Sequence, residues 1–122
     1  MEQPSLFEPP EPLPIRVMRE HADKFTEEFL QYLPDNLHVF TAFEREALQV
    51  VQRGWRHYSA RTIIHVLRHH SALQEVNGEG WKINDHVSPY LGRLFTLVHP
   101  QHAGLFEFRE AKAAKRDSQA AA

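Results

Sequence analysis

The spacing of apolar side chains predicts four helices, and the first runs from Arg16 to just before Pro34. Its apolar face repeats at i, i+4, i+7 and i+11 and consists of Met18, Ala22, Phe25 and Phe29. Five prolines precede this helix, the last at Pro14, and proline favours extended backbone over helix. Residues 1–14 are therefore expected to form an acidic, proline-rich, disordered arm.

The second predicted helix has a start signal of its own. The segment from Thr41 to Glu44 matches a capping box, in which the hydroxyl and the carboxylate each accept a hydrogen bond from a free backbone N–H. A short apolar segment, residues 37–40, precedes it, and Gly54 is expected to end it in the left-handed conformation. The apolar face of this helix consists of Phe43, Ala47, Leu48 and Val51.

Two further helices are predicted from their first residues. Ser59 suits the N-cap of a third helix, whose buried side consists of Ala60, Ile63, Ile64 and Leu67. Ser88 followed by Pro89 predicts the start of a fourth helix, which Pro100 closes. Its apolar face consists of Val87, Leu91, Leu94, Phe95 and Val98.

Two short segments alternate as β-strands do. One covers residues 81–84 and follows a hairpin-type Asn77-Gly78 pair, and the other covers residues 104–109, with Phe106 and Phe108 pointing inward. The order is three helices, strand, helix, strand. It predicts a mainly α fold with a small two-stranded β element (α+β class), winged-helix-like, as one globular domain over residues 15–110 with a flexible alanine-rich tail at 111–122.

Composition narrows the class of protein. The chain contains no cysteine, which excludes a disulfide scaffold and thiolate chemistry. It has no apolar run near the ~20 residues that span a bilayer, and its acidic start does not resemble a secretory signal. These features predict a cytoplasmic protein without a membrane contact.

The net charge of −2 hides a strong asymmetry along the chain. Residues 1–46 contain ten acids and four bases, whereas residues 47–122 contain six acids and ten bases. Residues 47–74 contain no acid, and their cationic side chains are Arg53, Arg56, His57, Arg61, His65, Arg68, His69 and His70. Such a segment attracts polyanions, unless the acidic first half folds over it and neutralises it.

These cations make nucleic acid the first partner considered. Arg61, His65 and Arg68 share one stripe of the third helix, and arginine and asparagine are the side chains that recognise guanine and adenine. The candidate binding residues are Arg53, Arg56, Tyr58, Arg61, His65, Arg68, Lys82, Asn84, Arg93 and Arg109. The alternative is a solvated basic helix face, because the sequence pI near 6.5 is below the value above ~9 of strongly basic binders.

Other chemistry has weaker support. His65 and His69 have the i, i+4 spacing of zinc ligands, but the sequence offers neither the glutamate of the His-Glu-x-x-His motif nor a third ligand, so no metal or cofactor is predicted. The chain has no nucleophile elbow or glycine-rich phosphate loop, so it is not predicted to be an enzyme. Trp55 and Tyr58 are expected to wedge the join between two helices rather than to stack on bases.

The segment His57–Ile64, the segment Trp81–Asn84 and the stretch from Pro100 to Arg109 resemble those of a group of small bacterial, phage and prophage proteins. The similarity covers about residues 43–109. It implies a bacterial or phage origin and work on nucleic acid or on host machinery, and it transfers no catalytic residue.

A second functional hypothesis is a protein-interaction module, for example a modulator that docks on a host protein. The acidic first half and the proline-rich arm favour it. It predicts an exposed apolar or acidic patch on the first helix, which includes Phe25 or Phe29 if these side chains are not part of the core. Either hypothesis is compatible with a monomer or a homodimer.

Overall fold

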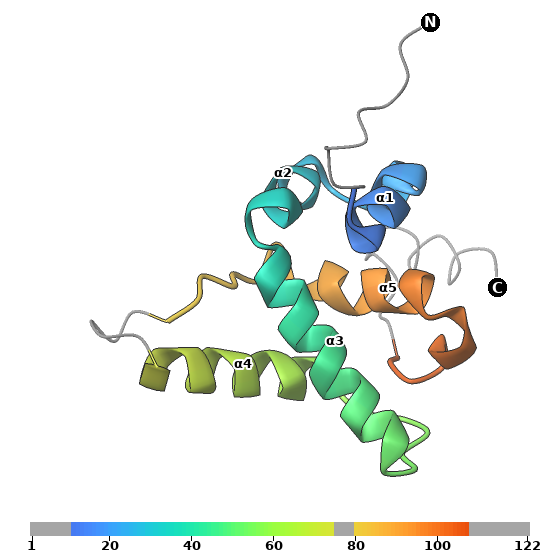
Figure 1. Ribbon diagram of the computed structural model, residues 1–122, viewed down its shortest axis with the longest axis vertical. Helices are drawn as coiled ribbons and strands as arrows, with labels where there is room; N and C mark the ends of the chain where they lie inside the picture. Colours follow the sequence, from blue (N-terminus) through green and yellow to red (C-terminus); the bar gives the residue numbers. More distant parts are fainter. Residues whose placement is uncertain (1–10, 75–79, 108–122) are drawn as a thin grey trace, which may run out of the picture.

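The computed structural model describes residues 11–74 and 80–107, and over these ranges the protein is helical (Figure 1). The elements follow in the order α1 (Leu13–Glu20), η1 (Ala22–Lys24), α2 (Glu27–Asp35), α3 (Leu37–Gln52), α4 (Ala60–Gln74), α5 (Ser88–Val98) and η2 (Pro100–His102), where η is a 3-10 helix. None of these helices is long and apolar enough to cross a membrane. Since the described ranges contain no strand, the predicted α+β, winged-helix-like fold is wrong.

Helix α5 occupies the centre of this arrangement and packs against α1, α3 and α4. Leu91, Leu94 and Phe95 from its predicted apolar face are completely buried. In Figure 1, α1 and α2 lie above α5, α4 lies below it, and α3 runs obliquely past both. The core therefore separates α1 and α2 from α4.

The predicted first helix is in fact two helices with a break between them. The chain leaves the helical conformation at His21 (φ −119°, ψ 34°) and is extended at Phe25 (φ −126°, ψ 151°). Thr26 then caps α2, because its Oγ1 accepts a hydrogen bond from the N–H of Phe29 at 3.3 Å. The break leaves Ala22 exposed, while both phenylalanines stay buried and stack with ring centroids 5.3 Å apart.

Prolines lie inside both of these helices. Pro14 is in the first turn of α1, where its missing N–H has no partner to lose, so the predicted arm ends at least two residues too late. Pro34 lies in the last turn of α2, one residue before the end of the helix. Residues 1–10 of the predicted arm lie outside the described residues.

Helix α3 begins at Leu37, four residues before the predicted capping box. Val39, Phe43 and Ala47 recur at intervals of four, so one continuous helix buries all three against the core. Thr41 is consequently an exposed residue within the helix rather than its N-cap. Burial of the apolar residues at 39 and 40 outweighs the local capping signal.

The predicted end of α3 at Gly54 is confirmed. Gly54 has φ 91°, which is the left-handed region. Its N–H donates to the carbonyl of Val51 at 2.9 Å, and the N–H of Trp55 donates to the carbonyl of Val50 at 3.3 Å. This pair of bonds is a Schellman motif, and it fixes the direction in which the chain leaves α3.

The N-cap predicted for α4 is also confirmed, because the Oγ of Ser59 accepts a hydrogen bond from the N–H of Thr62 at 3.2 Å. Helix α5 begins at Ser88 with proline in its first turn, but Ser88 is not its N-cap as predicted, because Val87 holds that position without a side-chain cap bond. The turn before α5 is instead held by the side chain of Asn84. The Oδ1 atom of Asn84 accepts hydrogen bonds from the N–H groups of His86 at 2.8 Å and Val87 at 3.0 Å.

The first predicted strand, residues 81–84, has no partner strand in the described ranges because helix side chains bind its backbone. The N–H of residue 81 and the carbonyls of residues 82 and 83 bond to the side chains of Ser71, Tyr32 and Arg68, respectively. These are the groups that a β-ladder would have used. Ile83 is nevertheless buried, as the alternation predicts.

The second predicted strand is a turn over its described part. Leu105 and Phe106 are adjacent and both buried, whereas a strand would point them to opposite faces. Phe106 packs against Phe43 of α3 and Phe95 of α5, with ring centroids 5.5 and 5.6 Å apart. The predicted Asn77-Gly78 turn, the inward position of Phe108, and the tail 111–122 lie outside the described residues.

The Tyr32 hydroxyl ties α2 to residues 80–84, because it donates to the carbonyl of Lys82 at 3.1 Å. Burial raises the pKa of Tyr32 from 10.0 to about 12. The unfolded chain therefore loses this proton at a lower pH than the folded protein. Folding stability should consequently fall as the pH rises from 10.0 to about 12.

Tyr32→Phe removes both the hydrogen bond and this titration. We expect the wild type to be more stable than the variant below pH 10.0 by a constant amount, and this advantage to shrink between pH 10.0 and about 12. Urea unfolding of both proteins across this range measures the difference directly. A difference that stays constant through the alkaline range would contradict the assignment.

Candidate nucleic-acid interface

The cationic side chains of residues 53–70 are mostly exposed. We use the term basic surface for seven of them, all exposed, which lie on the end of α3, the loop 53–59 and α4: Arg53, Arg56, His57, Arg61, His65, His69 and His70. The first turn of α4 adds the positive end of its helix dipole next to Arg61. The surface therefore combines arginine side chains, imidazoles and a helix N-terminus.

The acidic helices do not cover this surface. Residues 11–35, which include α1 and α2, contain six acids and three bases. Helix α1 packs on α5, and helix α2 packs on α3. Helix α4 packs on α3 and α5 from the other side, and Figure 1 shows α1 and α2 above α5 with α4 below it. The charge asymmetry of the sequence is thus also an asymmetry in space over the described residues.

Arg68 differs from the other arginines because its guanidinium is bound within the protein. Its Nε donates to the carbonyl of Ile83 at 3.0 Å, its Nη2 donates to the same oxygen, and Nη2 lies 3.5 Å from the carboxylate of Asp85. This half-buried side chain holds residues 80–85 against α4. Arg68 is therefore a structural residue that the sequence analysis placed in the binding site.

Asn84 is also engaged at both ends of its amide. Its oxygen accepts hydrogen bonds from the N–H groups of His86 and Val87, and its Nδ2 lies 3.5 Å from the carboxylate of Glu28 in α2. The side chain that the sequence suggests for adenine recognition thus holds the turn that precedes α5. Reading a base with this amide would require those contacts to break.

The remaining predicted residues are spread around the molecule. Lys82 is exposed, and Arg93 lies half-buried on α5 with its guanidinium carbon 5.2 Å from the ring centroid of Tyr90. Tyr58 is half-buried, and its N–H donates to the carbonyl of residue 105 at 2.9 Å. Arg109 lies outside the described residues. The structure therefore brings together Arg53, Arg56, Arg61 and His65 with Tyr58, and separates Arg93 from them.

The sequence analysis also assigned Trp55 wrongly. It predicts a buried wedge, but 57% of Trp55 is exposed. The indole meets the ring of Tyr58 edge to face, with centroids 5.7 Å apart and planes at 75°. A tryptophan next to a helix-ending glycine is compatible with either position, so the local sequence could not decide.

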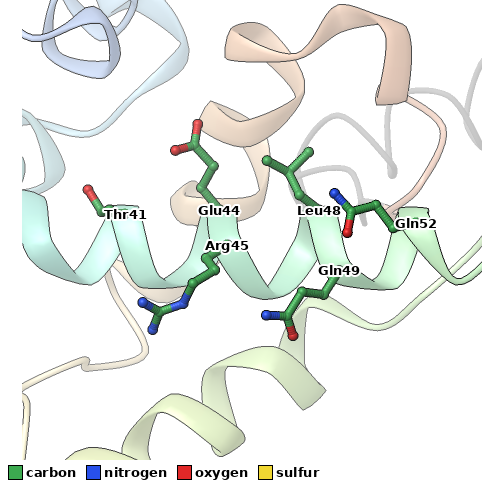
Figure 2. A pocket seen from close by; sticks show the side chains of 6 residues that line it. All are labelled: Thr41, Glu44, Arg45, Leu48, Gln49 and Gln52. Atoms are coloured by element: carbon green, nitrogen blue, oxygen red, sulfur yellow. The ribbon is translucent and has the colours of Figure 1, made fainter.

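A second residue that the sequence analysis missed is Arg45. It is exposed, and in Figure 2 it points from α3 to the side on which α4 lies. Charge counting overlooks it because glutamates precede and follow it. One of these, Glu44, points to the other side of α3 and lies 2.7 Å from Nε2 of His99.

The face of α3 that carries Arg45 also borders an open hollow of about 370 Å³. Its lining comes entirely from α3 and consists of Thr41, Glu44, Arg45, Leu48, Gln49 and Gln52 (Figure 2). The one carboxylate in this lining, that of Glu44, is bonded to Nε2 of His99 at 2.7 Å. In the described part of the chain, no three histidine, aspartate or glutamate side chains converge as a metal site requires.

Comparison of the chain with protein-family models, with curated proteins and with solved structures found no match. The resemblance to small bacterial and phage proteins therefore stays a prediction.

The different positions of Arg68 and Arg61 lead to a stability prediction. Arg68→Met keeps most of the apolar stem but leaves the carbonyl of Ile83 without its donor, so we expect a loss of about 1–3 kcal/mol in unfolding free energy. Arg61→Met is the matched control on the exposed face, with an expected change within about 0.5 kcal/mol. Chemical denaturation measures both. Equal losses would show that Arg68 does not hold the 80–85 segment.

Proposed function

We propose that this protein binds nucleic acid through the basic surface. The observation that carries the proposal is the run of exposed cations on α4 and the loop 53–59, on the opposite side of α5 from the acidic helices. Phosphate backbones are the most widespread polyanions that such a surface fits. Binding releases the counterions condensed on the phosphates, which supplies much of the affinity.

The arrangement also suggests how the polyanion runs along the surface. Helix α4 has fifteen residues and is about 22 Å long. Arg56 and Arg61 lie at its start, and His65 follows one turn later on the exposed side. The cations and the positive end of the helix dipole therefore concentrate at the N-terminal end of α4, where we expect the tightest phosphate contacts.

The competing hypothesis, docking on a host protein through the first predicted helix, loses the apolar form of its predicted patch. Only 8% of Phe25 is exposed and Phe29 is fully buried. Both rings pack against Tyr90 of α5, with centroids 6.0 and 5.6 Å away. These phenylalanines belong to the core and do not form an exposed apolar patch.

Charge reversal at Arg61 tests the proposal. We expect Arg61→Glu to weaken binding of a labelled oligonucleotide about tenfold at low salt. We also expect the slope of log affinity against log salt to become less steep, by the amount that corresponds to the loss of about one or two phosphate contacts. Fluorescence anisotropy with single- and double-stranded DNA and RNA, between about 50 and about 200 mM salt, measures both quantities.

Arg16→Glu is the matched control, because Arg16 is an exposed arginine on the acidic end and the change in net charge is identical. We expect it to weaken binding by less than about twofold. Equal effects of the two substitutions would contradict a local site and indicate a response to net charge alone. Absence of binding by the wild type at low salt would contradict the proposal itself.

A further inference from the structure

The most exposed aromatic side chain of the described residues lies within the basic surface. Trp55 is 57% exposed, and its neighbours in the loop, Arg53, Arg56 and His57, are all exposed as well. A single exposed apolar side chain is ordinary on a protein surface. A large ring surrounded by cations, in a loop without acids, has the composition of a site that stacks on a nucleic-acid base.

The backbone that carries the indole is held in place before any ligand arrives. The Schellman motif at Gly54 bonds the N–H of Trp55 to the carbonyl of Val50 at 3.3 Å. The indole ring itself meets the ring of Tyr58. The backbone N–H of Tyr58 donates to the carbonyl of Leu105 at 2.9 Å. Hydrogen bonds therefore hold the backbone of both residues of this aromatic pair, so little backbone freedom remains to be lost on binding.

We propose that the basic surface binds single-stranded nucleic acid, with a base stacked on the indole of Trp55 and the neighbouring phosphates bound by Arg53 and Arg56. This inference rests on the proposed function and specifies its ligand. In a duplex the base faces are covered by their neighbours and only the edges are accessible in the grooves. A single strand offers whole base faces to an aromatic ring, and this contact tolerates any base.

Tryptophan fluorescence tests the stacking contact directly. The chain contains two tryptophans, so Trp81→Phe leaves Trp55 as the sole fluorescent indole. Trp81 is half-buried and meets His38 of α3 edge to face, and phenylalanine keeps an aromatic ring at this position. We expect oligothymidine to quench the fluorescence of Trp81→Phe in a saturable way, at a concentration that matches its affinity by anisotropy.

Affinity of Trp55 variants gives an independent measurement. Stacking on one base changes affinity by about five- to 150-fold, so Trp55→Ala should lower the affinity for single-stranded oligothymidine by about tenfold. Its affinity for a duplex of equal length should change by less than about twofold. Trp55→Phe should retain most of the single-strand affinity. Because the indole is exposed, the urea midpoint of Trp55→Ala should stay close to that of the wild type.

The outcomes separate this inference from the proposed function. Quenching by the single strand, together with a selective loss in Trp55→Ala, supports the stacking contact. Arg61-dependent binding that is equal for duplex and single strand, with no effect of Trp55→Ala and no quenching, overturns the inference and leaves the proposed function standing. Absence of binding to every nucleic acid at low salt overturns both.

Discussion

Burial of α5 is the constraint on which the rest of this structure depends. Its Leu91, Leu94 and Phe95 have no exposed surface, and burying each side chain of this size stabilises the fold by about 1.5–3 kcal/mol. Phe95 also joins Phe43 and Phe106 in an aromatic cluster, so the same helix holds α3 and the turn after η2. With α5 in the centre, the first two helices and α4 can pack only on different sides of it. A charge asymmetry along the sequence thereby becomes a separation between two ends of the molecule.

The loops next to α5 depend on polar side chains rather than on a sheet. Tyr32, Arg68 and Ser71 bond to the backbone of residues 81–83, and Asn84 bonds to the N–H groups of the turn before α5. An unpaired buried carbonyl or N–H costs about 1–3 kcal/mol, and where this segment is partly buried its backbone groups bond to Arg68 and Ser71. Arg68 and Asn84 have the residue types of a base-reading site, but their positions assign them to stabilisation. Residue type alone cannot distinguish the two roles.

Signals within one or two helical turns were sufficient to predict α4 and α5, and also Gly54 and the cap at Ser59, because neighbouring residues determine these features. The start of α3, the break before Thr26 and the absence of strands in the described ranges depend on contacts between distant segments. In the same way, the basic segment was visible in the sequence. The sequence could not show that Arg61 is exposed while Arg68 is bound, because Arg68 is bound by the carbonyl of Ile83, fifteen residues further along the chain.

The isoelectric point near 6.5 is low for a protein that binds nucleic acid, but it is compatible with the proposed interface. Phosphates within about 8–10 Å of the surface respond to local charge, because salt screens charges that lie further away. The acids of α1 and α2 lie across α5 from the loop 53–59, so they lower the net charge to −2 without neutralising Arg56 or Arg61. The negative end instead repels a polyanion that approaches from the wrong side. Under the proposed function, charge separation therefore orients the encounter, and the loop carrying Trp55 provides the contact at which that encounter ends.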